Sequence, residues 1–221
     1  MSKGYFINDD SMNLDNLQAR LEATDLIPSL QILLDGLTEK LGALKKIGVR
    51  SVADLRTRLK SKKSLASLAD DSAMDFNYLV LLRRAIEGFF PKPQPLKAFD
   101  WLNRDTMAKL DRAGVRNTQQ LHEAALSGVD KLAGNAGLEE KNLSEFLALS
   151  DLSRIQWVSP TFARVLVAAG FTSAAMVATA NPEALHEAII EANDNARFYK
   201  GKVGLRDIKR LIAAAAYVPL G

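Results

Sequence analysis

The sequence contains no cysteine and only two histidines among its 221 residues. Without cysteine there is no disulfide, no thiolate metal site and no cysteine nucleophile. The histidines, His122 and His186, lack the His-Glu-x-x-His spacing of a zinc enzyme, so a metal site would require both to meet carboxylates from elsewhere. We therefore expect no bound metal and no cofactor.

Long apolar runs are missing as well. No segment is apolar over the length that spans a bilayer, and the N-terminus, MSKGYFINDDSMN, has no signal-peptide core. These absences predict a soluble, cytoplasmic protein without a membrane partner. Strand signals are also absent, since no run alternates β-branched and polar residues between turns. Apolar residues instead recur at spacings of three and four, as in Leu37, Leu41 and Leu44, which predicts an all-α fold.

Enzyme signatures are not present either. The sequence has no phosphate-binding loop, no Gly-x-Ser-x-Gly elbow and no dinucleotide fingerprint. The acidic pairs Asp70-Asp71 and Glu139-Glu140 are expected where helices begin, a place where negative charge favours the helix dipole. We therefore expect a binding or scaffolding protein that is not an enzyme and has no small-molecule substrate.

What the sequence does contain is a helical hairpin that occurs three times. The segments are LTEKLGALKKIGVRSVADL (37–55), LNRDTMAKLDRAGVRNTQQL (102–121) and VSPTFARVLVAAGFTSAAMV (158–177). In each, a leucine precedes a glycine by four residues, and an apolar residue follows the glycine. The glycine is expected to end one helix in the left-handed conformation, and a polar residue three positions later to cap the next helix. The glycines are Gly48, Gly114 and Gly170, and the caps are Ser51, Asn117 and Ser173.

A second turn follows each hairpin, at Ala73, Gly137 or Gly204, and leads into a final helix. The chain is thus expected to form tandem helical repeats. We place an N-terminal tail and helical arm at 1–30, with residues 1–12 loose, and repeats at 31–93, 94–150 and 151–221. The proline-rich PKPQP (91–95) marks the first boundary as a stiff spacer, and the third repeat is expected to pack with the second.

Residues 151–193 carry an Asp-Leu-x-Arg-Ile lead, a Leu-x-x-Ala-Gly turn and an Asn-Pro-x-x-Leu-His segment. The motif residues are Asp151, Leu152, Arg154 and Ile155; Leu166, Ala169 and Gly170; and Asn181, Pro182, Leu185 and His186. This stretch resembles a bacterial domain-of-unknown-function family, numbered 4332, that is related to helix-hairpin-helix and SAM-like domains. The resemblance implies tandem helix-hairpin-helix/SAM-like helical repeats and no established activity.

Helix-hairpin-helix modules that hold DNA use a glycine–apolar–glycine turn, whose bare amides contact phosphates. The triplets that match this turn here are Gly36-Leu37-Thr38, Trp101-Leu102-Asn103 and Trp157-Val158-Ser159. A tryptophan at the first position should obstruct a phosphate, so the resemblance leaves Gly36 and Thr38 as matching contacts. Trp101 and Trp157 are expected to pack in the core, or alternatively to anchor a protein partner.

Two basic clusters stand out from the overall charge of +3. They are RTRLKSKK (56–63) and FYKGKVGLRDIKRL (198–211), the second surrounding a glycine turn at the start of a helix. Either cluster is suited to phosphate contacts or, alternatively, forms an ordinary solvated helix face. The candidate nucleic-acid-binding residues are Gly36, Thr38, Lys40, Arg56, Arg58, Lys60, Lys62, Lys63, Lys200, Lys202, Gly204, Arg206, Lys209 and Arg210.

Two functions remain open at this point. The first is nucleic-acid binding through phosphate-backbone contacts at these basic turns, which the pI near 9.1 favours. The second is protein association of the SAM-like kind, without nucleic acid, in which an acidic face meets a basic one. Residues 1–36 carry two basic and six acidic side chains, whereas residues 37–98 carry thirteen basic and six acidic ones, so the two segments have opposite charge.

Overall fold

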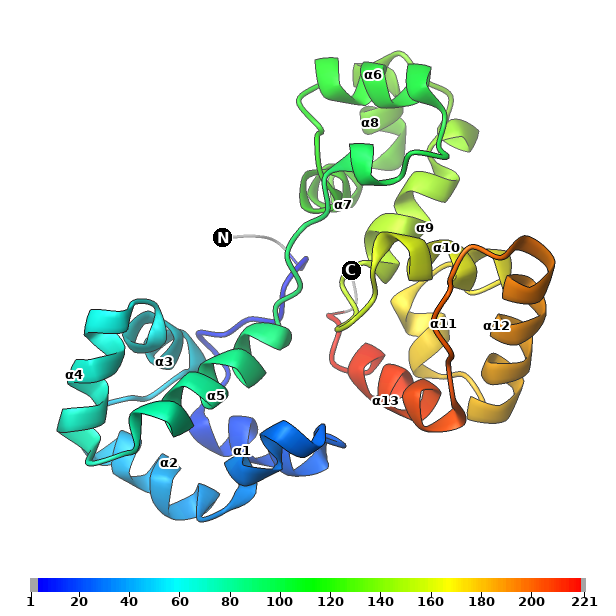
Figure 1. Ribbon diagram of the computed structural model, residues 1–221. Helices are drawn as coiled ribbons and strands as arrows, with labels where there is room; N and C mark the ends of the chain where they lie inside the picture. Colours follow the sequence, from blue (N-terminus) through cyan, green and yellow to red (C-terminus); the bar gives the residue numbers. More distant parts are fainter. Residues whose placement is uncertain (1–3, 220–221) are drawn as a thin grey trace. The chain divides into compact units, whose positions relative to one another are not determined.

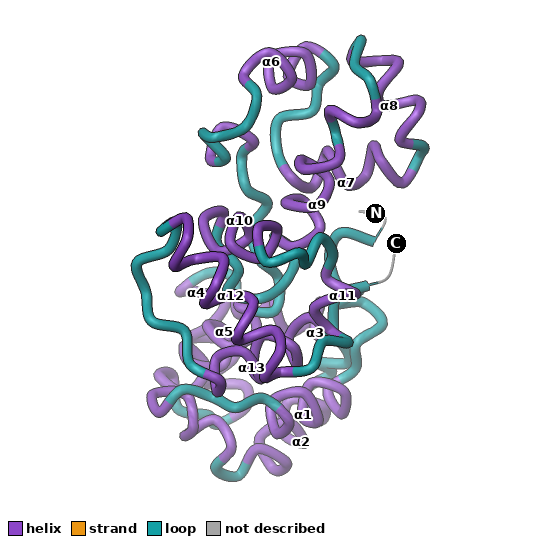
Figure 2. Tube along the Cα trace, turned by 90° about the vertical axis from the view of Figure 1, so that its right-hand side faces the viewer, coloured by secondary structure: helices purple, strands orange, loops and turns teal. Residues whose placement is uncertain are grey.

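The computed structural model describes residues 4–219 of the chain, and its regular secondary structure is entirely helical there (Figure 1). Figure 2 shows helices and loops and no strand in this range, so the expected all-α fold is confirmed. The chain divides into two compact units. The N-terminal unit is Asn8–Phe90, and the C-terminal unit joins Pro91–Gly221 to Met1–Ile7, of which residues 4–7 and 91–219 are described.

The N-terminal unit contains five α-helices and a 3₁₀-helix. These are α1 (Leu14–Ala23), η1 (Pro28–Leu34), α2 (Leu37–Lys46), α3 (Val52–Leu59), α4 (Lys62–Ser72) and α5 (Phe76–Gly88). Helices α3, α4 and α5 pack against one another, α1 packs on α2 and η1 on α5. Their apolar faces meet in a core that includes Leu17, Leu44, Leu55 and Ile86, all shielded from solvent.

The C-terminal unit contains eight α-helices and two 3₁₀-helices. They are η2 (Leu96–Ala98), α6 (Arg104–Arg112), α7 (Thr118–Leu126), α8 (Val129–Ala136), η3 (Glu140–Asn142), α9 (Ser144–Leu152), α10 (Pro160–Ala168), α11 (Ala174–Ala178), α12 (Pro182–Ala196) and α13 (Leu205–Ala215). Helix α9 packs on both α7 and α10, while α13 packs on α11 and α12. One continuous apolar core therefore extends from Leu96 to Ala215.

The three predicted glycine turns are present. After α2, Gly48 has a φ of +85°, its N–H donates to the Lys45 carbonyl (3.1 Å), and the Val49 N–H donates to the Leu44 carbonyl (3.1 Å). This pair of bonds satisfies carbonyls that the helix end would otherwise leave open. The same pair recurs at Gly114 and Val115 after α6, and at Gly170 and Phe171 after α10. The predicted caps Ser51, Asn117 and Ser173 each accept a backbone N–H at the start of the next helix.

The second turn leads into a helix at all three predicted positions, with a different backbone conformation at the last. Ala73 and Gly137 are left-handed, with φ of +53° and +63°, as a helix end requires. Gly204 is instead extended (φ −97°) and caps the start of α13. The left-handed residue that ends α12 is Arg197 (φ +51°). A loop joins Arg197 to α13. It is fixed to α12 by the Asn193 side-chain amide, which donates to the Tyr199 carbonyl and accepts the Tyr199 N–H, each at 2.8 Å.

Two expectations are wrong. Asp70 and Asp71 lie in the last turn of α4, not at a helix start, because Ser61 and Ser64 cap each other's backbone and begin α4 at Lys62. Residues 4–12 are not loose: Tyr5 is only 2% exposed in the C-terminal unit. Residues 1–3 lie outside the described part of the chain.

Candidate nucleic-acid interface

The polar side chains beside the turn before α2 are bonded within the N-terminal unit. Gly36 is left-handed (φ +59°) and exposed. The Thr38 hydroxyl, however, accepts a hydrogen bond from the Gln18 amide (2.9 Å). The Lys40 ammonium donates to the Asp35 carbonyl and lies 4.0 Å from the centre of the Tyr78 ring. Burial raises the pKa of Tyr78 to about 12, so this ring stays neutral beneath the lysine.

The arginines of the first basic cluster are also engaged within the N-terminal unit. Arg56 pairs with Asp9 (2.5 Å) and Glu87 (3.0 Å) and stacks 4.0 Å from the centre of the Phe90 ring. Partial burial opposes the charge of Arg56, but the hydrogen bonds to Glu87 and Asp9 outweigh it and raise the pKa of its guanidinium. Arg58 donates to the Ile47 carbonyl (3.3 Å) and lies 3.9 Å from Asp71. Both arginines therefore stabilise the fold.

The lysines of this cluster are different. Lys60, Lys62 and Lys63 are exposed and form no ion pair within residues 4–219. Lys62 and Lys63 are the first two residues of α4, whose first turn contains no acid. Positive charge at a helix start and negative charge at its end, here Asp70 and Asp71, both oppose the helix dipole. The charges of α4 are therefore arranged against the stability of the helix itself.

The second basic cluster likewise contains groups that are bonded within the protein and lysines that are exposed. Lys200 and Lys202 are exposed and unpaired within the described chain, in the loop that leads to α13. The Gly204 N–H, expected to face a phosphate, donates to the Asp207 carboxylate instead (3.0 Å). Lys209 lies 3.9 Å from Glu183. Arg206, the second residue of α13, is exposed.

The two tryptophans do not share one environment. Trp101 is half-buried, packs edge-on against Phe99 and donates its indole N–H to Glu145 (3.3 Å). Trp157 is 51% exposed and has a φ of +70°. Its ring is covered by the guanidinium of Arg210, whose Cζ lies 4.8 Å from the ring centre. Core packing is therefore correct for Trp101 and wrong for Trp157.

The family model of DUF4332, a domain of unknown function, matches residues 102–218, which is more than half of the chain. The chain belongs to the DUF4332 family. No curated protein and no solved structure matches it. The DUF4332 region contains Trp157 and the second basic cluster, whereas the first cluster lies before it, in the N-terminal unit.

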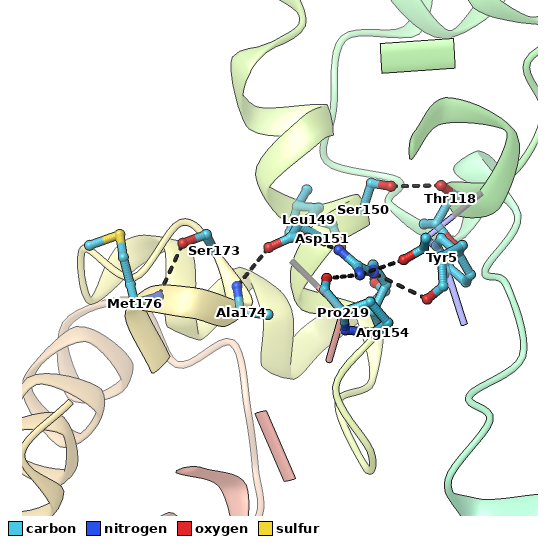
Figure 3. A network of polar contacts seen from close by, with 12 residues as sticks. Tyr5, Thr118, Leu149, Ser150, Asp151, Arg154, Ser173, Ala174, Met176 and Pro219 are labelled. Carbon is cyan, nitrogen blue, oxygen red and sulfur yellow. Dashed lines mark hydrogen bonds and ion pairs between the residues drawn. The ribbon is translucent and has the colours of Figure 1, made fainter. Parts of the chain in front are cut away.

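The DUF4332 region also contains a buried polar network that the sequence analysis missed (Figure 3). At its centre Arg154, 5% exposed, pairs with Asp151 (2.5 Å) and donates to the carbonyls of Gly4 (2.6 Å), Tyr5 (3.2 Å) and Pro219. The second Asp151 oxygen accepts the N–H that begins α11. Asp151 and Arg154 both belong to the Asp-Leu-x-Arg-Ile motif. Their opposite charges, three residues apart, were the one sign of this network in the sequence.

Around this network, the Tyr5 hydroxyl shares a 2.6 Å hydrogen bond with Thr118, and burial raises the pKa of Tyr5 to about 12. The His122 ring packs edge-on against Tyr5, and its buried Nε2 has no hydrogen-bond partner in the described part of the chain. Burial and, to a lesser degree, the charge of Arg154 lower the pKa of His122. His186 instead bonds the Val203 carbonyl (2.9 Å).

The described part of the DUF4332 protein offers no three histidine, aspartate or glutamate side chains grouped to hold a metal ion. Nor does any helix between residues 4 and 219 combine the length and apolar character needed to cross a membrane.

Proposed function

We propose that the chain is a non-enzymatic nucleic-acid-binding protein built from tandem helix-hairpin-helix/SAM-like repeats. It holds the phosphate backbone through lysines at the start of α4 and in the loop before α13. The observation that carries this proposal is the trio Lys60, Lys62 and Lys63, exposed and unpaired among the described residues, at a helix start where positive charge is unfavourable.

A bound phosphate reverses this unfavourable electrostatics. The first amides of a helix point out of its N-terminus and attract anions, and lysines beside them add charge. Three lysines around one helix start therefore form a site that is repulsive when empty and favourable when a phosphate is present. Release of counterions from the nucleic acid supplies further free energy and makes binding steeply dependent on salt.

The loop before α13 supports the same conclusion. Lys200 and Lys202 extend from exposed positions that are free of ion pairs in the described structure, close in sequence to the aromatic residues Phe198 and Tyr199. The proposed phosphate contacts are fewer than the candidate residues that the sequence indicates. Because Thr38, Lys40, Arg56 and the Gly204 amide have partners inside the protein, the proposal rests on the five open lysines.

The second candidate is SAM-like protein association. It is favoured by η1, where Ile32 is 54% and Leu34 39% exposed within the acidic segment 1–36. Exposed apolar side chains close together in an acidic stretch fit a basic, partly apolar protein surface.

The test is fluorescence anisotropy of labelled single-stranded and duplex DNA and RNA against the protein, at low and physiological salt. Substituting Glu for Lys60, Lys62 and Lys63 should weaken binding at least 10-fold. It should also reduce the slope of log K against log salt by about 2 to 3, the value for three lost phosphate contacts.

The matched control replaces three exposed lysines outside both clusters, Lys46, Lys92 and Lys131, with Glu and so changes the net charge equally. This control should change affinity much less. The cluster variant should be at least as stable as the native protein, because glutamate at the start of α4 favours the helix dipole. Absence of binding to every probe at low salt overturns the proposal, and loss of concentration-dependent self-association in an Ile32→Ser/Leu34→Ser variant would then favour the second candidate.

A further inference from the structure

We propose that Trp157 and Arg210 form a stacking platform for an unpaired base, so that the C-terminal unit binds single-stranded nucleic acid in preference to duplex. This inference rests on the proposed function and specifies the form of nucleic acid that the second basic cluster accepts.

The first observation is the backbone of Trp157. Its φ of +70° lies in the left-handed region, which is strongly disfavoured for a bulky side chain and freely open to glycine. Gly36, at the matching position in the N-terminal unit, has a similar φ (+59°) and is a glycine. Packing does not explain the tryptophan, because half of its surface is exposed. A strained residue held in the open points to a role in binding.

The second observation is the partner of the indole. Arg210 projects from α13 and places its guanidinium over the Trp157 ring, 4.8 Å from the centre. The Arg210 Nε is buried and has no hydrogen-bond partner among residues 4–219, so the ring contact is the interaction that this side chain shows there. A guanidinium over an indole fixes the ring by cation–π attraction and leaves its exposed side for a second flat group.

The third observation is the charge around the platform. Helix α13 places Arg206 one turn before Arg210, on the same side of the helix, with Lys209 next to it. Lys200 and Lys202 precede α13 in the loop, and Asp207 is occupied in capping Gly204. A flat aromatic beside several cations matches a base and its phosphates, since aromatic stacking combined with a basic track is how single strands are held without sequence readout. A paired base in a duplex offers no free face to the indole.

The test compares three probes of equal length: an oligo-dT strand, the same strand with abasic sites throughout, and a duplex. The variant is Trp157→Gly, since glycine adopts the left-handed conformation without strain and should leave the fold intact, as checked by circular dichroism. We expect Trp157→Gly to weaken binding of oligo-dT about 10-fold, consistent with loss of one stacked base, and to leave binding of the abasic strand unchanged.

A Trp101→Phe protein serves as control and reporter, because Trp157 is then the sole tryptophan. Its fluorescence should be quenched by oligo-dT and not by the abasic strand. Equal binding of oligo-dT by the native and Trp157→Gly proteins overturns the platform and leaves the proposed function standing. Quenching by a polyglutamate peptide as strong as by oligo-dT overturns it in favour of an acidic protein ligand. If the native protein binds none of the probes, the proposed function fails and this inference with it.

Discussion

Arg154 shows how one buried side chain organises the C-terminal unit. A buried guanidinium is costly unless its donors are satisfied, and here Asp151 and three backbone carbonyls accept them. Two of the carbonyls belong to residues 4 and 5 and one to residue 219, so a single cation holds two segments far apart in sequence. By contrast, the buried Nε2 of the neighbouring His122 accepts or donates no hydrogen bond within residues 4–219.

The stability of the C-terminal unit should therefore fall when the pH is lowered from 7.5 to 5.5. The pKa of His122 is lowered in the folded protein, chiefly by burial and also by Arg154, which outweigh the opposing charges of Asp151 and Glu123. The unfolded chain, with an ordinary histidine pKa near 6.5, then takes up a proton more readily than the folded one, and protonation favours unfolding. The contribution of neutral His122 to stability is fully present above pH 6.5 and is progressively lost as the pH falls below that value.

Urea titrations followed by tryptophan fluorescence measure this effect, because Trp101 and Trp157 both lie in the C-terminal unit. In a His122→Gln variant the difference between the two pH values should shrink. An unchanged difference would assign the pH dependence to other groups.

Among the helical elements, the three glycine turns share one construction, and α2 offers a direct test of it. Gly48 ends α2 with a φ of +85°, while Gly42 lies inside the same helix. Apart from chain neighbours and the backbone of the helix itself, no described atom lies within 4 Å of the position that a Cβ would take at either. Gly48→Ala should destabilise the N-terminal unit by about 1–2 kcal/mol, because alanine is strained in the left-handed conformation. Gly42→Ala should stabilise it by about 0.5–1 kcal/mol, because alanine is the better helix former.

Circular dichroism during thermal unfolding of the two variants measures both signs on one helix. A gain of stability from Gly48→Ala would show that the turn after α2 does not require a left-handed residue, and a loss from Gly42→Ala would contradict the expected gain in helix propensity.

The glycine turns could be predicted because their bonds join residues three to five positions apart, as between Leu44 and Val49. Arg197 could not, since a left-handed arginine has no sequence signal and depends on the loop that Asn193 closes. The same limit applies to the candidate site. The basic runs were visible, but the engagement of Arg56 with Glu87 and Asp9 joins residues 31 and 47 positions apart. The sequence therefore located the basic clusters but overestimated how many of their side chains are exposed and unpaired.

On the scale of the complete chain, the N-terminal unit is an insertion. The chain contributes residues 4–7 to the C-terminal unit, forms the N-terminal unit from 8 to 90, and returns at 91. The first segment is held by Tyr5, whose ring is buried and whose hydroxyl bonds Thr118, 113 positions away. The C-terminal unit thus depends on residues that precede the N-terminal one.

Substitution of Tyr5 should therefore affect the more distant part of the sequence. Tyr5→Ala removes a buried aromatic ring and should destabilise the C-terminal unit by about 3 kcal/mol. Tyr5→Phe, which removes only the hydrogen bond to Thr118, should cost about 1 kcal/mol. Hydrogen exchange resolved by residue should show faster opening in α7 and α9 and unchanged protection in α3 and α5. Equal loss of protection in both sets of helices would contradict this division.

The clamp on residues 4 and 5 has a consequence for synthesis on the ribosome. Arg154, whose guanidinium donates to the Tyr5 carbonyl, leaves the ribosome 149 residues after Tyr5. At 5–20 residues per second this delay is about 7–30 s, long enough for the intervening N-terminal unit to complete its helices. Tyr5 thus waits for its native partner through the synthesis of the whole intervening unit, and Tyr5 and Phe6 stay available to chaperones until Arg154 arrives.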